Sequence, residues 1–300
     1  MYKFFGASAV AIIAASTPAI AGDEVLYDTT PEWVQIADLE MDAALDGPSE
    51  VLYDWQHRLE DGVVHEYNDR AVRIDNLEAL TSEGTLQMTW APDKGDLTIH
   101  RLEILRGDEV IDLVADGVEF EVIRREQGLE RRLLDGRLTA TVAVPGLEEG
   151  DILRVAHSIT LDDQALGDEM QALQYLPPEP YRVGKGRTIV SWPKNDDIGY
   201  RAGPFVDLPE PVTKGGYKYL TVDLPIAKRE DMPNDVPSRF SRSPLLRVGS
   251  FDSWNELSRV MEPHFTKAAA IPENSALSKQ VAAIEAATDD FYEFFPNTLN

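Results

Sequence analysis

The chain has 300 residues and an acidic composition, with 53 Asp and Glu against 28 Lys and Arg and a formal net charge of −25. Such a charge disfavours nucleic acid and anionic lipid as partners, because both are bound through basic side chains that neutralise phosphates. The sequence contains no cysteine, which excludes a thiol nucleophile, a thiolate metal site and a CxxC redox pair, and a chain of this length can fold without disulfides.

Residues 1–21 have the pattern of an export signal. Lys3 precedes an uncharged apolar run from Ala7 to Ala15, and Ala19-Ile20-Ala21 is a small-x-small motif that signal peptidase accepts. The apolar run is shorter than the roughly 20 residues that span a bilayer. We therefore predict cleavage before Gly22 and a periplasmic or secreted mature protein that does not insert into the membrane.

The mature chain is predicted to begin with an extended lead-in over residues 22–48, in which Trp33 packs on the body of the protein. A β-sandwich domain is predicted over residues 49–225, because apolar and polar residues alternate in short runs that turn residues separate. These runs are Val51 to Gln56, Val63 to Ile74, Thr85 to Trp90, Leu97 to Leu105, Glu109 to Leu113, Arg187 to Trp192 and, as the last strand, Tyr217 to Pro225. The fold class that follows is all-β, a mainly antiparallel β-sandwich with a short α-helical C-terminal extension.

The clearest strand pair is predicted between Leu138 and Thr160. Two runs of alternating residues flank a turn formed by Pro145-Gly146 and Glu149-Gly150, which is typical of a β-hairpin with one face toward a core. Glycine supplies positive φ in such turns, so we interpret the Gly residues as turn chemistry and not as a binding site.

The periodicity becomes helical near the C-terminus. A Pro-rich connection over residues 226–249 leads into a helical extension over residues 250–300. A capping box at Ser253 begins the first helix, which Pro263 is expected to end. A second helix is predicted from about Ser275.

Several motifs follow one another in a characteristic order: LTSEG at 80–84, LTIHRLEILRG at 97–107, FEVIRRE at 120–126, LE at 129–130, LDGRLTA at 134–140 and GDIL at 150–153. In this order they resemble the bacterial domain-of-unknown-function family 3857, over roughly Leu52 to Phe265. The resemblance implies an exported β-domain upstream of a transglutaminase-like, papain-type cysteine domain. The catalytic Cys, His and Asp of that domain have no counterpart here. We therefore expect a truncated or frameshifted product, in which Phe291 to Asn300 is not native to the family.

No catalytic, cofactor-binding or metal-binding residue is predicted. The histidines form no HxH, HExxH or i,i+4 pair, and we interpret all five as structural: His57, His65, His100, His157 and His264. No G-x-S-x-G motif accompanies a serine. The carboxylates of residues 161–169 lack the spacing of a calcium loop and are interpreted as an exposed acidic connection, and residues 184–188 lack the form of a phosphate loop.

We therefore predict a non-catalytic module that uses no cofactor and binds or presents a protein or peptide partner; the sequence does not indicate its oligomeric state. The helix around Trp254 and the aromatic tail indicate a surface for that partner. Two alternatives remain open. One is a hydrolase whose Ser, His and Asp meet on the sandwich edge. The other is a carbohydrate-binding sandwich with Trp55, Trp90, Trp192 or nearby tyrosines on an exposed flat platform.

Overall fold

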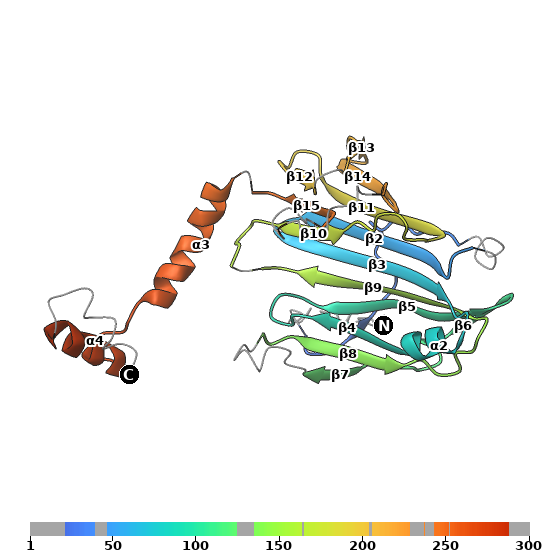
Figure 1. Cartoon of the computed structure of the whole chain (residues 1–300), viewed down its shortest axis with the longest axis horizontal. Helices are drawn as coiled ribbons and strands as arrows, with labels where there is room; N and C mark the ends of the chain where they lie inside the picture. Colours follow the sequence, from blue (N-terminus) through green and yellow to red (C-terminus); the bar gives the residue numbers. More distant parts are fainter. Residues whose placement is uncertain are drawn as a thin grey trace, which may run out of the picture.

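The computed structural model describes residues 22–39, 47–124, 135–163, 165–203, 206–228, 237, 243–251 and 253–287. The predicted signal and the tail from Phe291 lie outside these residues. The described chain forms three β-sheets and the helices α2 (Leu77–Glu83), α3 (Trp254–Ala269) and α4 (Ala276–Ala287) (Figure 1). This confirms the prediction of a mainly antiparallel, all-β sandwich with a helical C-terminal extension. None of the described helices is long and apolar enough to cross a membrane.

One large sheet runs through the molecule in the order β1-β5-β9-β3-β2-β11-β14-β13, and β6 also pairs with β5. Only the β1–β5 and β2–β11 pairs of this sheet are parallel. Its strands are β1 (Leu26–Tyr27), β2 (Glu50–Glu60), β3 (Val63–Arg73), β5 (Leu97–Arg106), β6 (Glu109–Asp112), β9 (Ile152–Leu161), β11 (Lys185–Pro193), β13 (Val212–Lys214) and β14 (Tyr217–Leu224).

Two small antiparallel sheets complete the sandwich. The first small sheet has the order β4-β8-β7 and contains β4 (Thr85–Trp90), β7 (Glu121–Arg124) and β8 (Leu138–Ala143). The second small sheet has the order β10-β15-β12 and contains β10 (Gln171–Tyr175), β12 (Gly199–Ala202) and β15 (Leu245–Gly249).

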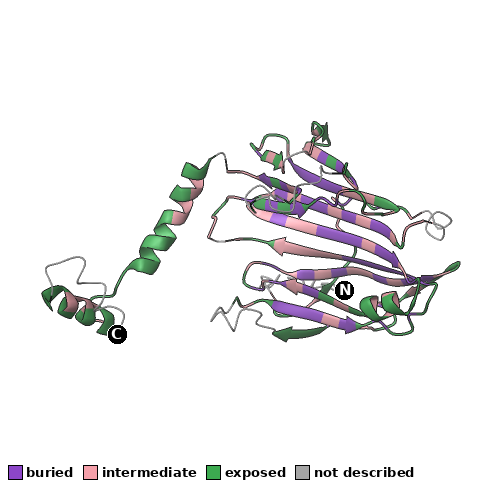
Figure 2. Ribbon diagram, in the orientation of Figure 1, coloured by how far each residue is buried: buried purple, intermediate pink, exposed green. Residues whose placement is uncertain are grey.

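Both small sheets pack on the same face of the large sheet, which we call the inner face. The first covers β5 and β9, and the buried side chains of that core include Trp90, Leu97, Ile104, Ala140 and Leu153. The second covers β11 and β14, in a core that includes Leu59, Trp192, Leu220, Leu246 and Val248. The inner face therefore carries two separate cores, and Figure 2 shows that the middle strands β2 and β3 also contain buried residues.

The lead-in crosses the opposite face of the large sheet, which we call the outer face. Val34 and Ala37 are buried there, and Val34 packs with Tyr67 of β3. The guanidinium carbon of Arg58 lies 5.4 Å from the ring centroid of Trp33, in the geometry of a cation–π contact. The prediction that Trp33 packs on the body is confirmed.

Strand β5 has apolar residues at both odd and even positions, and a β-bulge is the reason. Its register against β9 shifts between Ile99 and Arg101, which places a β-bulge at His100. Ile99 before the bulge and Leu102 after it are both buried in the same core. A bulge changes which face the following residues point to, so the alternation fails at this position alone.

The predicted hairpin between Leu138 and Thr160 is wrong. Strand β8 pairs with β4 and β7 in the first small sheet, whereas β9 pairs with β3 and β5 in the large sheet. The connection is a corner between layers: Arg106 donates to both carboxylate oxygens of Asp151, at 2.8 and 2.7 Å, and to the carbonyl of Gly146 at 2.8 Å. The corner and a hairpin require the same turn residues, including positive φ at Gly150 (+97°).

Two predictions near the C-terminus are also wrong. The last strand is β15 and not Tyr217 to Pro225, and it is the central strand of the second small sheet. Helix α3 continues through Pro263 to Ala269. Proline removes one main-chain donor, and on an exposed helix the carbonyl that loses this donor can bond water instead. The predicted cap is confirmed, since the Ser253 hydroxyl accepts from the Glu256 amide at 3.3 Å, and the second helix is confirmed as α4.

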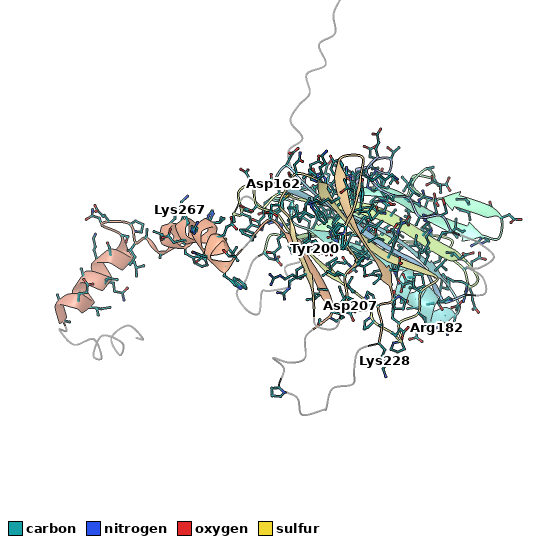
Figure 3. All side chains as sticks on the ribbon, turned by 90° about the horizontal axis from the view of Figure 1, so that it is seen from above. Asp162, Arg182, Tyr200, Asp207, Lys228 and Lys267 are labelled. Carbon is teal, nitrogen blue, oxygen red and sulfur yellow. The ribbon has the colours of Figure 1, made fainter. Side chains whose placement is uncertain are left out.

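Helices α3 and α4 project away from the sandwich (Figure 1). Neither helix contains a buried residue, and Trp254 is 83% exposed. Figure 3 shows the same arrangement from above, with Lys267 on α3 clear of the sheets. The cores of the sandwich are therefore built without these helices.

Candidate functional site

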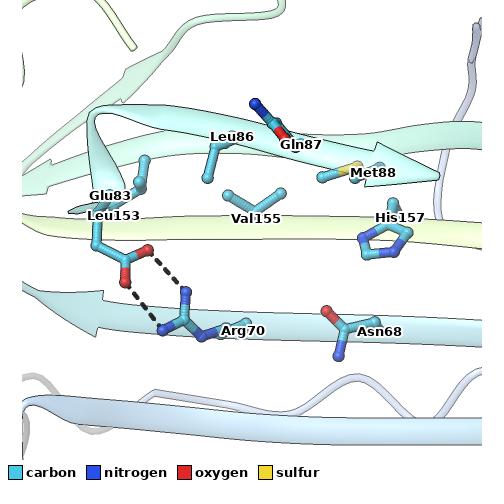
Figure 4. A pocket seen from close by; sticks show the side chains of 9 residues that line it. All are labelled: Asn68, Arg70, Glu83, Leu86, Gln87, Met88, Leu153, Val155 and His157. Carbon is cyan, nitrogen blue, oxygen red and sulfur yellow. Dashed lines mark hydrogen bonds and ion pairs between the residues drawn. The ribbon is translucent and has the colours of Figure 1, made fainter. Parts of the chain in front are cut away.

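Strands β3 and β9 run through the middle of the molecule, between the two small sheets (Figure 1). A cavity of about 180 Å³ lies there, and we call it the inter-sheet groove. It is lined by Asn68, Arg70, Glu83, Leu86, Gln87, Met88, Leu153, Val155 and His157 (Figure 4). Cofactor and drug-sized ligand sites occupy roughly 300–1,000 Å³, so this groove has room for one or two amino-acid side chains.

Strand β4 forms one wall of the groove. The Val144 amide donates to the Gly84 carbonyl at 3.0 Å, and in an antiparallel ladder this makes Leu86 and Met88 the next residues bonded to β8. The main-chain groups of Gln87 therefore point to the other side of β4. Among the described residues β4 pairs with β8 alone, so this side is an open strand edge.

The side chains of β4 fit this arrangement. Leu86 and Met88 point toward β9, whereas the Gln87 side chain points away from it (Figure 4). Gln87 nevertheless lines the groove, which places the main chain of β4 at the wall. An open strand edge is a template for another extended chain. On this edge the Thr89 carbonyl already accepts from Arg137 at 3.4 Å.

An ion pair closes one end of the groove. Arg70 of β3 donates to both oxygens of Glu83 on α2, at 2.7 and 3.0 Å, and to Glu50 of β2 at 3.1 Å. These carboxylates hold the pKa of Arg70 above its usual range, although burial alone would lower it. Helix α2 positions Glu83 through its N-cap, because the Asn76 side chain accepts from the Ala79 amide at 2.9 Å. Sequence reasoning did not predict this short helix.

Three polar residues lie at the same level on adjacent strands of the large sheet, which forms the floor of the groove. Trp55 of β2 lies opposite Asn68 of β3, which lies opposite His157 of β9. We call these three residues the polar row. Trp55 Nε1, Asn68 Nδ2 and His157 Nδ1 are buried atoms, and none has a hydrogen-bond partner among the described residues. Buried polar atoms are nearly always paired, so a row of three unpaired nitrogens indicates a place for a ligand.

The groove environment keeps His157 neutral. Burial disfavours the imidazolium and His100 repels it, which lowers the pKa of His157 to about 4. The carboxyl pKa of Glu66, the neighbour of Asn68 along β3, is raised by burial and lowered less by His57. His157 therefore offers an uncharged hydrogen-bonding group at neutral pH.

The depressed pKa of His157 predicts an acid-dependent loss of stability. The unfolded chain takes up a proton at this histidine near pH 6.5, whereas the folded protein does so only near pH 4. The stabilising contribution is therefore complete above about pH 6.5 and is lost as the pH falls toward 4. We expect the unfolding free energy of His157→Leu, measured by urea unfolding, to fall less steeply than that of the wild type as the pH is lowered over this range. His264→Leu, on the exposed helix α3, should keep the wild-type slope; an unchanged slope in His157→Leu would contradict the prediction.

The outer face carries a buried network of two carboxylates and two guanidinium groups. Asp54 and Asp69 lie opposite each other on β2 and β3, and both are fully buried. Arg187 donates to Asp54 at 3.0 and 2.7 Å, and Arg154 donates to Asp69 at the same two distances. Burial raises the pKa of Asp54 despite the opposing effect of Arg187.

The lead-in seals this network. Arg154 donates to the Ala37 carbonyl at 2.9 Å, and the Gln56 side chain exchanges hydrogen bonds of 2.9 and 3.0 Å with the main chain of Gln35. Asp54 also accepts from Gln56 at 3.0 Å. Each charged group of the network is thus paired and covered, so we assign it a structural role in holding the lead-in.

The histidines lie mostly within strands, as predicted, and do not form a catalytic triad. His57 is buried against Gln174 at 3.1 Å, and the His65 ring lies tilted against Trp33, with ring centroids 6.4 Å apart. His100 contacts the Ser158 hydroxyl through Nε2 at 2.7 Å and the Asp28 main-chain carbonyl through Nδ1 at 2.9 Å. This pair lacks a carboxylate behind the imidazole and lies outside the inter-sheet groove, so the described residues do not support the hydrolase alternative.

The tryptophans do not form a platform for carbohydrate. Trp90 and Trp192 are each only 1% exposed, because both lie in the sandwich cores. Trp55 is half-buried and stacks on His57 of the same strand, with ring centroids 6.4 Å apart. A flat aromatic surface for sugar rings would need these rings to be exposed together.

No group of three or more His, Asp or Glu that could hold a metal ion occurs within the described ranges. In the predicted acidic connection, Asp162 is exposed and Asp163 forms an ion pair with Lys94 at 2.8 Å. Residues 185–188 belong to β11 and so form a strand instead of a phosphate loop.

Comparison with known proteins places the fold. Residues 60–225 match a domain of unknown function with solved structure (DUF3857). No curated protein is similar to the chain. A protein of Parabacteroides distasonis ATCC 8503 described as a "putative protease" has a TM-score of 0.59 and 16% identity, over 80% of this chain and 46% of that one. The M1 zinc metallopeptidase of Deinococcus radiodurans reaches a TM-score of 0.32 at 13% identity, over 68% of this chain and 42% of that one.

At these identities the first likeness concerns the fold alone, and the second is too distant to carry an argument. The chain spans less than half the length of both solved proteins. The family match covers more than half of the 300 residues. It includes the first small sheet, β10 and β12 of the second, and the strands of the large sheet from β3 to β14. This chain belongs to the DUF3857 family.

Proposed function

We propose that this chain is an exported, non-catalytic module that binds an extended polypeptide segment of a partner protein in the inter-sheet groove. The segment pairs with the open edge of β4 and lies above β3 and β9. The single observation that carries this proposal is the coincidence of an open strand edge at Gln87 with a side-chain-sized groove and unpaired polar atoms on its floor.

The chemistry of the walls supports a polypeptide ligand. An added strand gains main-chain hydrogen bonds from β4, and every second side chain then points to the floor. Leu86, Val155 and Leu153 can bury an apolar side chain of such a strand. In a protein of the architecture that the family resemblance implies, the bound segment would be held for a neighbouring domain of the same polypeptide.

The experiment measures binding of one defined peptide by isothermal titration calorimetry. The probe is a short acetylated and amidated peptide in which valine and threonine alternate, with glutamine at its centre and lysine at both ends. Gln87→Pro is expected to weaken its binding about tenfold or more, because proline removes the edge amide and its ring obstructs an incoming strand. The ladder between β4 and β8 is preserved, because Gln87 does not donate to β8.

Gln87→Val is the matched control, since it changes the same side chain but keeps the amide. It should bind the probe as the wild type does. Equal affinities of Gln87→Pro and the wild type would show that the β4 edge is not used. Failure of the wild type to bind the probe even at millimolar concentration would count against the module as a whole.

A further inference from the structure

We infer that the polar row is a specificity pocket that selects an uncharged, hydrogen-bonding side chain, an amide above all, on the bound polypeptide. This inference rests on the proposed function and adds which side chain the groove prefers. It follows from the register of three strands and from the charges around them.

The register brings the unpaired nitrogens to one place. Trp55, Asn68 and His157 occupy adjacent strands at the same level, and adjacent strands lie about 4.8 Å apart. Asn68 is 6% exposed, lines the groove and has an unpaired Nδ2 amide. Figure 4 shows Asn68 and His157 together at the end of the groove away from Arg70 and Glu83. Asn68 and His157 both line the groove, so one ligand side chain can reach both of them.

Hydrogen-bond chemistry defines what that side chain must carry. The Asn68 Nδ2 amide, whose residue lines the groove, can only donate, so the ligand must present an acceptor oxygen. A side chain without an acceptor would leave this buried donor unpaired, which is more costly than the loss of an ordinary hydrogen bond. An aliphatic side chain is therefore disfavoured at this level.

The surrounding charges select against a carboxylate. Arg70 is shared by Glu50 and Glu83, so this cluster carries an excess negative charge, and Glu66 lies beside Asn68 on the same face. His157 supplies no compensating positive charge while it is neutral. A lysine ammonium can only donate, so it would leave the Asn68 Nδ2 donor unpaired. An amide satisfies the row because it accepts through its carbonyl and adds no charge.

The apolar side chains of the floor determine which ligand side chain is preferred next to the amide. Val155 precedes His157 by two residues on β9 and faces the same groove, as does Leu153 beyond it. Residues two apart in an added strand are spaced like residues two apart in β9, at about 6.8 Å. A strand with its amide side chain above the polar row therefore places its next inward side chain above Val155. The preferred pattern therefore has an amide residue and an apolar residue two positions apart.

The test extends the peptide series by changing only the central glutamine to leucine or to glutamate. The wild type should bind the glutamine peptide at least about tenfold more tightly than either variant peptide. Asn68→Leu, similar in size but without a donor, should lose this preference and bind the leucine peptide as well as or better than the glutamine peptide. Thr213→Val on the exposed strand β13, at the far edge of the large sheet, is the control and should keep the wild-type preference.

The outcomes separate this inference from the function on which it rests. If no peptide of the series binds, the proposed function fails. If all three bind equally to the wild type, or if Asn68→Leu keeps the preference for glutamine, the specificity pocket is wrong while the binding module stands. Should Asn68→Leu not fold, as judged by circular dichroism, His157→Leu is tested instead and should reduce the same preference.

Discussion

Replacing Asp69 by asparagine is expected to lower the free energy of unfolding by about 3–5 kcal/mol, since it leaves the Arg154 guanidinium buried without its counter-charge. The two carboxylate oxygens of Asp69 accept from Arg154 at 3.0 and 2.7 Å, and neither side chain has more than 9% exposure. Asparagine preserves the size of the residue, so the loss reports on charge and hydrogen bonding and not on a cavity. Urea unfolding followed by circular dichroism measures it.

An exposed ion pair gives the control for this variant. Asp75 pairs with Arg73 at the surface, and Asp75→Asn should cost about 1 kcal/mol or less. Replacing Asp69 and Arg154 together by leucine should cost less than Asp69→Asn alone, because the double variant leaves no buried charge unpaired. If Asp69→Asn proved as mild as Asp75→Asn, water would have to reach the outer-face network, contrary to its burial.

Trp192→Ala is expected to lower the free energy of unfolding by about 3–5 kcal/mol through the cavity that it leaves in the second core. Trp192 is 1% exposed and packs with Leu220 of the neighbouring strand and with the second small sheet. A domain has roughly 5–15 kcal/mol of stability in total, so this variant should melt at a much lower temperature. Differential scanning calorimetry measures the change.

Trp254→Ala is the matched tryptophan control. Trp254 is 83% exposed at the start of α3, and its removal should change the stability of the sandwich by less than about 0.5 kcal/mol. An effect comparable to that of Trp192→Ala would mean that Trp254 is covered in solution, either by the sandwich or by a second copy of the chain. Sedimentation analysis of the wild type would distinguish these two explanations.

Local patterns were sufficient to predict where most strands lie but not which strands pair. Thr85 to Trp90 is strand β4 with the predicted bounds, because alternation and turn residues are properties of the segment itself. The predicted pairing of β8 with β9 was wrong because pairing depends on distant contacts. A hairpin and a corner between layers share the same turn residues. What separates them is the contact of Arg106 with Asp151, which joins positions 45 residues apart.

The candidate site was out of reach of sequence reasoning for a related reason. Trp55, Asn68 and His157 are ordinary members of three strands, and their relation exists only once the register of β2, β3 and β9 is known. The interpretation of His157 as structural was reasonable for a lone histidine in a strand. One signal was available: polar residues at inward-facing positions of central strands, where apolar residues are the usual choice.

The parallel pairing of β2 with β11 determines the order in which this protein can fold. Lys185 lies beside Leu52 in the register, so one side of β2 stays unpaired until a segment more than a hundred residues further along the chain has emerged. The second core requires β15 as well, near residue 249. A topology dominated by such distant contacts folds slowly, because long loops must close before their contacts form. The large sheet is therefore completed only after most of the polypeptide is available to fold.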